Sequence, residues 1–131
     1  QEAVLADAEL DGFARVSGVL NLMIAEEYEA STEGHAAGCM VVTTRMTPDR
    51  GSQDPRVARI LDRALGRQLA MLEHAVRAGR FDGSLRPDLD ARDTALLVVT
   101  LISGIRVMAQ AGSAPEELRR IVALGLSALT P

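Results

Sequence analysis

The chain has the length and composition of one folded globular domain. Its 131 residues are 47% hydrophobic and 24% charged, which excludes a disordered chain, and a chain of this length buries roughly two-thirds of its unfolded surface. The longest uncharged run, residues 94–105, is shorter than the about twenty residues of a membrane span, and there is no secretion signal, so we expect a cytoplasmic protein.

Charge and cysteine content exclude two kinds of site. The net charge is −4, and nucleic-acid affinity depends on clustered basic residues that neutralise phosphates, so we expect these residues alone to bind DNA poorly. Cys39 is the single cysteine. An intrachain disulfide and a metal site built from cysteines are therefore excluded.

Glycine, proline and polar residues divide the chain into helical segments, and strand signals are nearly absent. The sequence therefore predicts one all-α domain over residues 1–131. An amphipathic pattern is already present at Val4 and Leu5, so we expect the chain to continue upstream of Gln1. The first full helix has its apolar residues three and four apart from Phe13 to Ile24, and its end, at residues 26–29, is acidic and solvated. A short helix follows from about His35 to Met46.

The third helical segment is long and begins at a clear signal. Asp54 is an expected N-cap and Pro55 fits the first helical position. Gly79 is expected to end this helix at about Ala78. Its expected inner stripe is Val57, Leu61, Ala64, Leu65, Gln68, Leu72 and Ala75, and the residues expected to face water are Arg59, Asp62, Arg63, Glu73 and Arg77.

The last two helices carry apolar residues around most of their circumference. Asp90 is the expected cap of the first, and Ser113 with Glu116 is the expected capping box of the second. Apolar faces this broad need a second burial partner, which predicts a homodimer with a four-helix bundle about a two-fold axis. The alternative is an intrachain contact with the first full helix. The expected interface comprises Leu97, Leu101, Gly104, Ile105, Met108, Leu118, Ile121, Val122 and Leu126.

The sequence offers little for catalysis. His35 and Cys39 have the spacing of two metal ligands on a helix, but no third ligand accompanies them, and His74 is expected in solvent or at the boundary of the core. None of the glycine-rich phosphate loops or nucleophile motifs is present. We therefore expect no enzyme activity, no cofactor and no metal.

Polar and flexible side chains at apolar positions predict a ligand cavity instead. Gln68 lies in the middle of an apolar stripe, where an unsatisfied amide costs about 1–3 kcal/mol, and several methionines provide adaptable walls. Alternatively, these residues simply fill the core. Arg106, inside an apolar helix, requires an acidic partner or a path to water, and Arg86 is expected to pair with Asp88. The expected cavity lining is Phe13, Leu20, Met23, Met40, Thr43, Thr44, Gln68, Met71 and Leu72.

Four stretches, in this order, give the sequence a resemblance to a known family. They are Gly38-Cys39-Met40, Asp54-Pro55-Arg56-Val57, Leu85-Arg86-Pro87-Asp88-Leu89-Asp90, and Gly104-Ile105-Arg106-Val107 followed by Ala111-Gly112. Over about His35 to Leu129 the chain resembles the ligand-binding and dimerisation domain of TetR/AcrR-type bacterial transcriptional regulators.

The resemblance implies a function in sensing. It implies an all-helical effector-binding domain whose last two helices form the dimer bundle, with a small-molecule cavity among the preceding helices. The few aromatic residues and scattered charges near the expected cavity indicate an apolar effector. Effector binding would release operator DNA from N-terminal helix-turn-helix heads, which have no counterpart in residues 1–131. The alternatives are a headless dimerisation module without a small-molecule effector and a headless protein that senses a ligand or inactivates a partner dimer.

Overall fold

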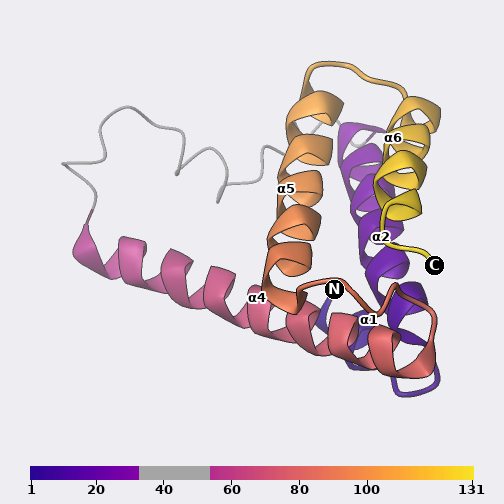
Figure 1. The fold of residues 1–131 in the computed structure, drawn as a ribbon. Helices are drawn as coiled ribbons and strands as arrows, with labels where there is room; N and C mark the ends of the chain where they lie inside the picture. Colours follow the sequence, from indigo (N-terminus) through magenta and orange to yellow (C-terminus); the bar gives the residue numbers. More distant parts are fainter. Residues whose placement is uncertain (33–53) are drawn as a thin grey trace.

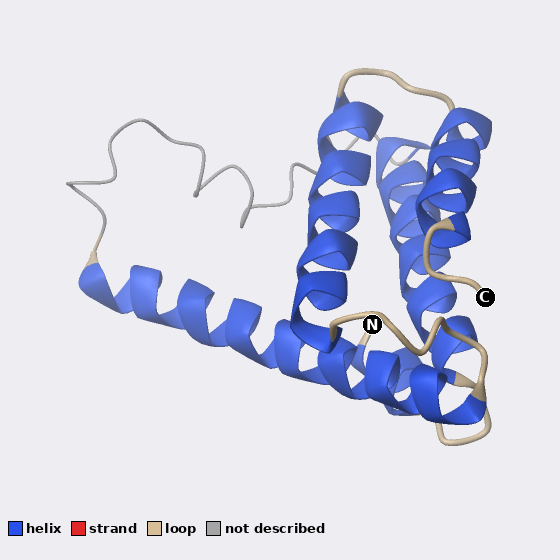
Figure 2. Ribbon diagram, viewed as in Figure 1, coloured by secondary structure: helices blue, strands red, loops and turns tan. Residues whose placement is uncertain are grey.

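The computed structural model describes residues 1–32 and 54–131, and within these two stretches it contains helices and no strands (Figures 1 and 2). The helices are α1 (Glu2–Ala6), α2 (Gly12–Thr32), α4 (Pro55–Asp82), α5 (Ala91–Gln110) and α6 (Pro115–Ser127). The all-α prediction is confirmed. The short helix expected at His35–Met46 lies outside the described residues, together with Met40, Thr43 and Thr44 of the expected cavity.

The helices form an upright group on one long helix. Figure 1 shows α4 lying across the base, with α2, α5 and α6 standing on its C-terminal half, while its N-terminal half extends beyond them. Helix α2 contacts each of the other four helices, and α1 packs on both α2 and α4. One hydrophobic core joins all five helices, and its largest fully buried side chains are Leu20, Met23, Ile24, Leu72, Leu85, Leu129, Val16, Val19, Val76 and Val98.

The predicted starts of α4 and α5 are confirmed. The side chain of Asp54 accepts a hydrogen bond from the backbone N–H of Arg56 at 2.9 Å, and that of Asp90 accepts one from Asp93 at 2.8 Å. The predicted capping box of α6 is wrong by one residue. The carboxylate of Glu117, and not that of Glu116, accepts from the backbone N–H of Ala114 at 3.1 Å.

The predicted end of α4 at Gly79 is also wrong. The helix continues to Asp82 and ends at Gly83, which adopts the left-handed conformation with φ of +83°. Gly79 is buried instead, because the start of α2 and the side chain of Leu85 pack directly against its backbone. Gly79, which was predicted to end the helix, therefore lies inside α4 at a close contact between the two helices.

The inner face of α4 also differs from the predicted stripe. Leu72 and Ala75 are buried as expected, but Val57 is 42% exposed and Ala64 is exposed, because the N-terminal half of α4 extends beyond α2, α5 and α6. The core contacts of α4 are made instead by residues of its C-terminal half, Leu69 and Val76 among them. Glu73, expected in water, is mostly covered and pairs with Arg77 and with Arg92 of α5.

The start of α2 is held by the last residue of α4 and by the loop that follows it. The backbone N–H of Gly12 donates to Asp82 Oδ2 at 3.0 Å, and that of Phe13 donates to Ser84 Oγ at 3.0 Å. The hydrogen bonds from Ser84 and Gly12 keep the pKa of the Asp82 carboxyl below its ordinary value. This pair of side chains supplies partners for backbone donors that the first turn of a helix cannot satisfy.

Asp82→Asn is expected to lower the free energy of unfolding at pH 7 by less than about 1 kcal/mol, because the amide oxygen can still accept these hydrogen bonds but lacks the charge that strengthens them. Because the folded-state pKa of Asp82 is lowered, its carboxylate stabilises the fold above the ordinary aspartate pKa of about 3.9, and this stabilisation is lost as the pH falls through the folded-state value. Urea denaturation at pH 7 and at about pH 2 should show a difference from the wild type that shrinks at the lower pH. Glu9→Gln, at an exposed carboxylate, is the control and should leave both curves close to those of the wild type.

Helix α5 is long and apolar enough to cross a membrane by length and composition alone. In this fold it is instead a wall of the helical group, where it contacts α2, α4 and α6. It also carries Arg106, whose guanidinium pairs with a carboxylate of α2. These contacts bury part of its apolar surface, while Leu96, Leu97, Val107 and Met108 each remain 40% or more exposed.

Candidate functional site

Five partly or fully buried side chains form a polar cluster at the margin of the apolar core, and we call Gln1, Met23, Glu27, Gln68 and Arg106 the polar core cluster. Gln68 Nε2 donates to Gln1 Oε1 at 3.2 Å, and Gln1 Nε2 donates to Met23 Sδ at 2.8 Å. Arg106 Nη2 donates to the same sulfur at 3.5 Å, and its Nη1 lies 3.5 Å from Glu27 Oε1. The cluster thus joins the beginning of the chain with α2, α4 and α5.

Glu27 is the most deeply buried charged group among the described residues. Its side chain is 6% exposed and that of Arg106 is 18% exposed. Burial raises the pKa of the Glu27 carboxyl, and the positive charge of Arg106 opposes this rise. The prediction that Arg106 needs an acidic partner is confirmed, whereas the prediction of a solvated Glu27 is wrong. Glu27 lies four residues after Met23 and so continues the buried face of α2.

The expected cavity residues that the structure describes do not all lie together. Leu20, Met23 and Leu72 are completely buried in the core, and Gln68 reaches Met23 through Gln1. Phe13 lies beside Ser84 at the start of α2, about 15 Å along the helix from Met23. Met71 lines a shallow depression between α1 and α4 with Leu5, Arg67, Ala70 and His74.

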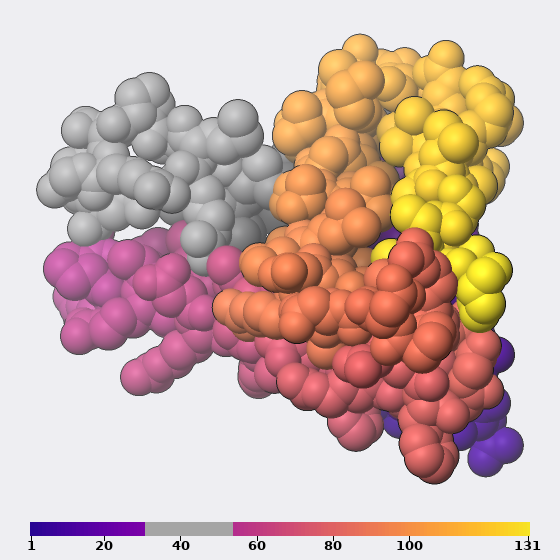
Figure 3. All heavy atoms as spheres, viewed as in Figure 1, coloured from indigo at the N-terminus to yellow at the C-terminus, as the bar shows by residue number. Residues whose placement is uncertain are grey.

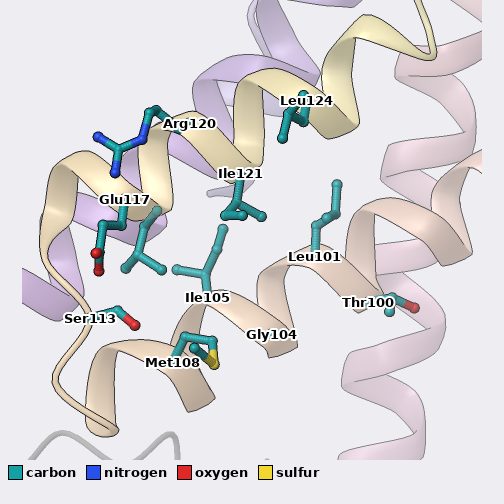
Figure 4. A pocket seen from close by; sticks show the side chains of 11 residues that line it. Thr100, Leu101, Gly104, Ile105, Met108, Ser113, Glu117, Arg120, Ile121 and Leu124 are labelled. Atoms are coloured by element: carbon teal, nitrogen blue, oxygen red, sulfur yellow. The ribbon is translucent and has the colours of Figure 1, made fainter.

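A second candidate site is an apolar groove between α5 and α6, with a volume of about 690 Å³. We call it the α5–α6 groove; Figure 3 shows the hollow between the two helices, and Figure 4 shows side chains of both helices facing it. Six of the nine expected interface residues line it. The lining consists of Thr100, Leu101, Gly104, Ile105, Met108, Ser113, Glu117, Leu118, Arg120, Ile121 and Leu124.

The other three expected interface residues lie elsewhere. Leu97 is 40% exposed and lies one turn before Leu101 on α5. Val122 and Leu126 are buried in the core of their own chain. Leu124 was not predicted as an interface residue, but it lines the groove and is exposed. It lies three residues after Ile121 on the same face of α6.

Histidine and the acidic residues form no metal site in the part of the chain that is described. His74 is exposed, as predicted, whereas His35 and Cys39 lie outside the described residues. Arg86 pairs with Asp88 as predicted, with Nε donating to Oδ1 at 3.0 Å. This pair lies in the loop between α4 and α5, where Arg86 also holds the C-terminal end of the chain through the carbonyl of Ala128.

Comparison with known proteins identifies a family. Residues 13–124 match the family of tetracyclin repressor-like C-terminal domains. A comparison with curated protein sequences found no match.

Two solved structures of the TetR family transcriptional regulator CifR, both of cysteine mutants complexed with 26-bp double-strand operator DNA, share this fold. The first has a TM-score of 0.77 and 24% sequence identity, and the match covers 98% of this chain and 64% of that chain. The second has a TM-score of 0.76 and 25% identity, and covers 97% of this chain and 63% of that chain. The present chain therefore spans slightly less than two-thirds of the length of these regulators. The family match extends over most of its residues, so the chain belongs to the family of C-terminal domains of TetR-type transcriptional regulators.

Proposed function

We propose that this chain is the effector-sensing and dimerisation domain of a bacterial, cytoplasmic TetR-type transcriptional repressor. The observation that carries the proposal is the α5–α6 groove, a broad apolar surface on the last two helices of a domain of this family. Leu97, Met108, Ile121 and Leu124 leave 40% or more of their surface uncovered there or beside it. Contiguous apolar surface of this kind marks an interaction site.

The partner that we propose for the groove is a second copy of the chain. A two-fold axis along the groove lets α5 and α6 of both copies form a four-helix bundle and covers each groove with the same surface of the partner. Gly104 has open space where a Cβ would lie, which permits close approach of the two backbones. Glu117 and Arg120 lie at its edge with opposite charges, so a two-fold arrangement allows them to pair across the interface.

The effector site that we propose lies among α2, α4 and α5, and the polar core cluster supports it. Buried polar groups surrounded by apolar side chains are typical of ligand sites, in which a few polar groups orient a mainly apolar molecule. The proposed lining consists of Leu20, Met23, Gln68 and Leu72, whereas Phe13 and Met71 lie apart from them and Met40, Thr43 and Thr44 lie outside the described residues. We propose no catalysis, cofactor or metal.

Effector binding would act on operator DNA through an N-terminal helix-turn-helix domain. The CifR structures contain operator DNA, whereas this chain is acidic, with a net charge of −4. We propose that the effector favours a dimer whose DNA-binding heads no longer fit the operator, which requires tighter binding to that state than to the DNA-compatible one.

A dimerisation module without an effector is the second candidate. The observation that favours it is the dense packing of the core, where Leu20, Met23 and Leu72 have no exposed surface. In such a module the polar core cluster would serve only to hold α2, α4 and α5 in register. The two candidates share the groove and differ in whether a small molecule binds.

Native mass spectrometry of the gently purified chain tests the proposal, because it reports the number of subunits and any bound small molecule together. A dimer carrying a discrete additional mass is the expected result. A dimer without additional mass, both as purified and after incubation with a library of small apolar compounds, supports the dimerisation module. A monomer at micromolar concentration contradicts the role proposed for the α5–α6 groove.

A further inference from the structure

Two hydrogen-bond donors inside the core point to the same weak acceptor. The amide of Gln1 and the guanidinium of Arg106 both donate to Met23 Sδ, at 2.8 and 3.5 Å. A thioether sulfur is a poor acceptor compared with an oxygen atom, and Arg106 has five N–H donors to satisfy. An oxygen atom placed at the position of the sulfur would therefore be bound more strongly than the sulfur is.

The ion pair between Arg106 and Glu27 is a loose one. Their closest atoms are 3.5 Å apart, longer than the about 2.8 Å of a well-formed charge-assisted hydrogen bond. Among the described residues, the guanidinium is therefore held near Glu27 mainly by charge, and its hydrogen bond goes to the weak acceptor Met23 Sδ. Met23 has an unbranched and flexible side chain, so it can change rotamer and vacate the position in front of Arg106.

The charge of the cluster determines which kind of oxygen fits. Arg106 and Glu27 carry opposite charges and balance each other. A ligand carboxylate would bring a second negative charge next to the Glu27 carboxylate in a water-poor environment, where an unbalanced charge is costly. A neutral carbonyl oxygen accepts the same hydrogen bonds without disturbing this balance.

We propose that the effector is a neutral, mainly apolar molecule with a carbonyl oxygen, and that this oxygen replaces Met23 Sδ as the acceptor for Arg106 and Gln1. The remainder of the molecule lies against the apolar side chains around the cluster, Leu20 and Leu72 among them. This inference rests on the proposed effector-sensing function and adds to it the chemical class of the ligand and the residue that selects it.

Three probes of seven carbon atoms separate the possible chemistries: methyl pentyl ketone, heptanoate and heptene. Calorimetric titration of the chain, at a pH at which heptanoate is ionised, is expected to show the ketone binding about tenfold or more tightly than either of the other two. Equal affinities for ketone and heptene would overturn the inference while leaving effector sensing in place. Failure of all three probes to bind would overturn the inference, whereas effector sensing itself is decided separately by native mass spectrometry.

Two variants test the assigned residues with opposite expected effects. Arg106→Met should reduce the preference for the ketone over heptene, because the charged donor is gone and the amide of Gln1 remains as the other donor. Glu27→Gln leaves Arg106 charged and removes the competing carboxylate, so heptanoate should gain at least about tenfold in affinity and bind more tightly than the ketone.

The Glu27→Gln variant tests the inference even if Arg106→Met fails to fold. A purely structural Glu27 would, on substitution, weaken all three probes together or affect none, and either outcome would overturn the inference. Arg63→Met is the matched control, because Arg63 is exposed on the outer side of α4, and it should preserve the preference for the ketone.

Discussion

Ile121→Glu is expected to convert the proposed dimer into monomers, with an increase of about 100-fold or more in the dissociation constant. Ile121 is 52% exposed in the isolated chain and lies in the α5–α6 groove opposite α5. In a two-fold interface every substitution occurs twice, so two carboxylates would be buried against apolar surface. Sedimentation equilibrium over a range of micromolar concentrations measures the change.

Phe81→Glu is the matched control for this substitution. Phe81 is also a large apolar residue and is 95% exposed, but it lies near the end of α4, outside the α5–α6 groove. The same charge placed there should leave the dissociation constant unchanged. Equal weakening by both variants would show that added negative charge, and not the groove, controls assembly, while a dimer that survives Ile121→Glu would place the interface on another surface.

Sequence patterns predicted the helices where local signals and packing agree. Asp54 and Asp90 are caps because a short acidic side chain directly before a helical pattern has one favourable partner, the free backbone N–H groups of the first turn. Gly79 shows where the same reasoning fails. A glycine at the end of an apolar pattern can mark a left-handed helix end or a close contact between two helices, and only the tertiary fold, in which α2 begins against Gly79, distinguishes them.

The polar core cluster was only partly predictable for a similar reason. The position of Gln68 on an apolar stripe and of Arg106 in an apolar helix indicated that both require partners. Which partners they have depends on contacts between residues far apart in the chain, 83 positions for Arg106 and Met23 and 67 for Gln68 and Gln1. The position of Glu27 was recoverable, because it follows the spacing of the buried residues of α2.

The sequence indicated a broad apolar surface on α6, but it did not show which of these residues are buried in the core of the chain and which are exposed. Leu118, Val122, Leu126 and Leu129 recur three and four residues apart and are buried in the core of the chain. Ile121 and Leu124, three residues apart, are exposed in the groove. A stripe this broad on a helix requires burial on both sides, yet composition alone cannot tell which residues face which side.

Gly12→Ala is expected to be the most destabilising single-methyl change in the described part of the chain. A Cβ at this position would overlap the backbone of Gly79 and lie 2.6 Å from the carbonyl oxygen of Ala75. Backbone atoms of a helix cannot move aside as a flexible side chain can, so α2 and α4 must separate. The separation would also stretch the hydrogen bond from Gly12 to Asp82. We expect a loss of about 3 kcal/mol and a fall in Tm of roughly 10 °C.

Gly66→Ala is the opposite case on the same helix and serves as the control for Gly12→Ala. Gly66 lies in the interior of α4, is exposed, and has no atom within 4 Å of an added Cβ. Alanine should therefore stabilise the chain by about 1 kcal/mol through its higher helix propensity. Thermal and urea denaturation of the two variants should give shifts of opposite sign. A Gly12→Ala variant as stable as the wild type would mean that α2 and α4 do not approach each other at Gly12 and Gly79. It would also contradict the capping of α2 by Asp82 and Ser84, which depends on that contact.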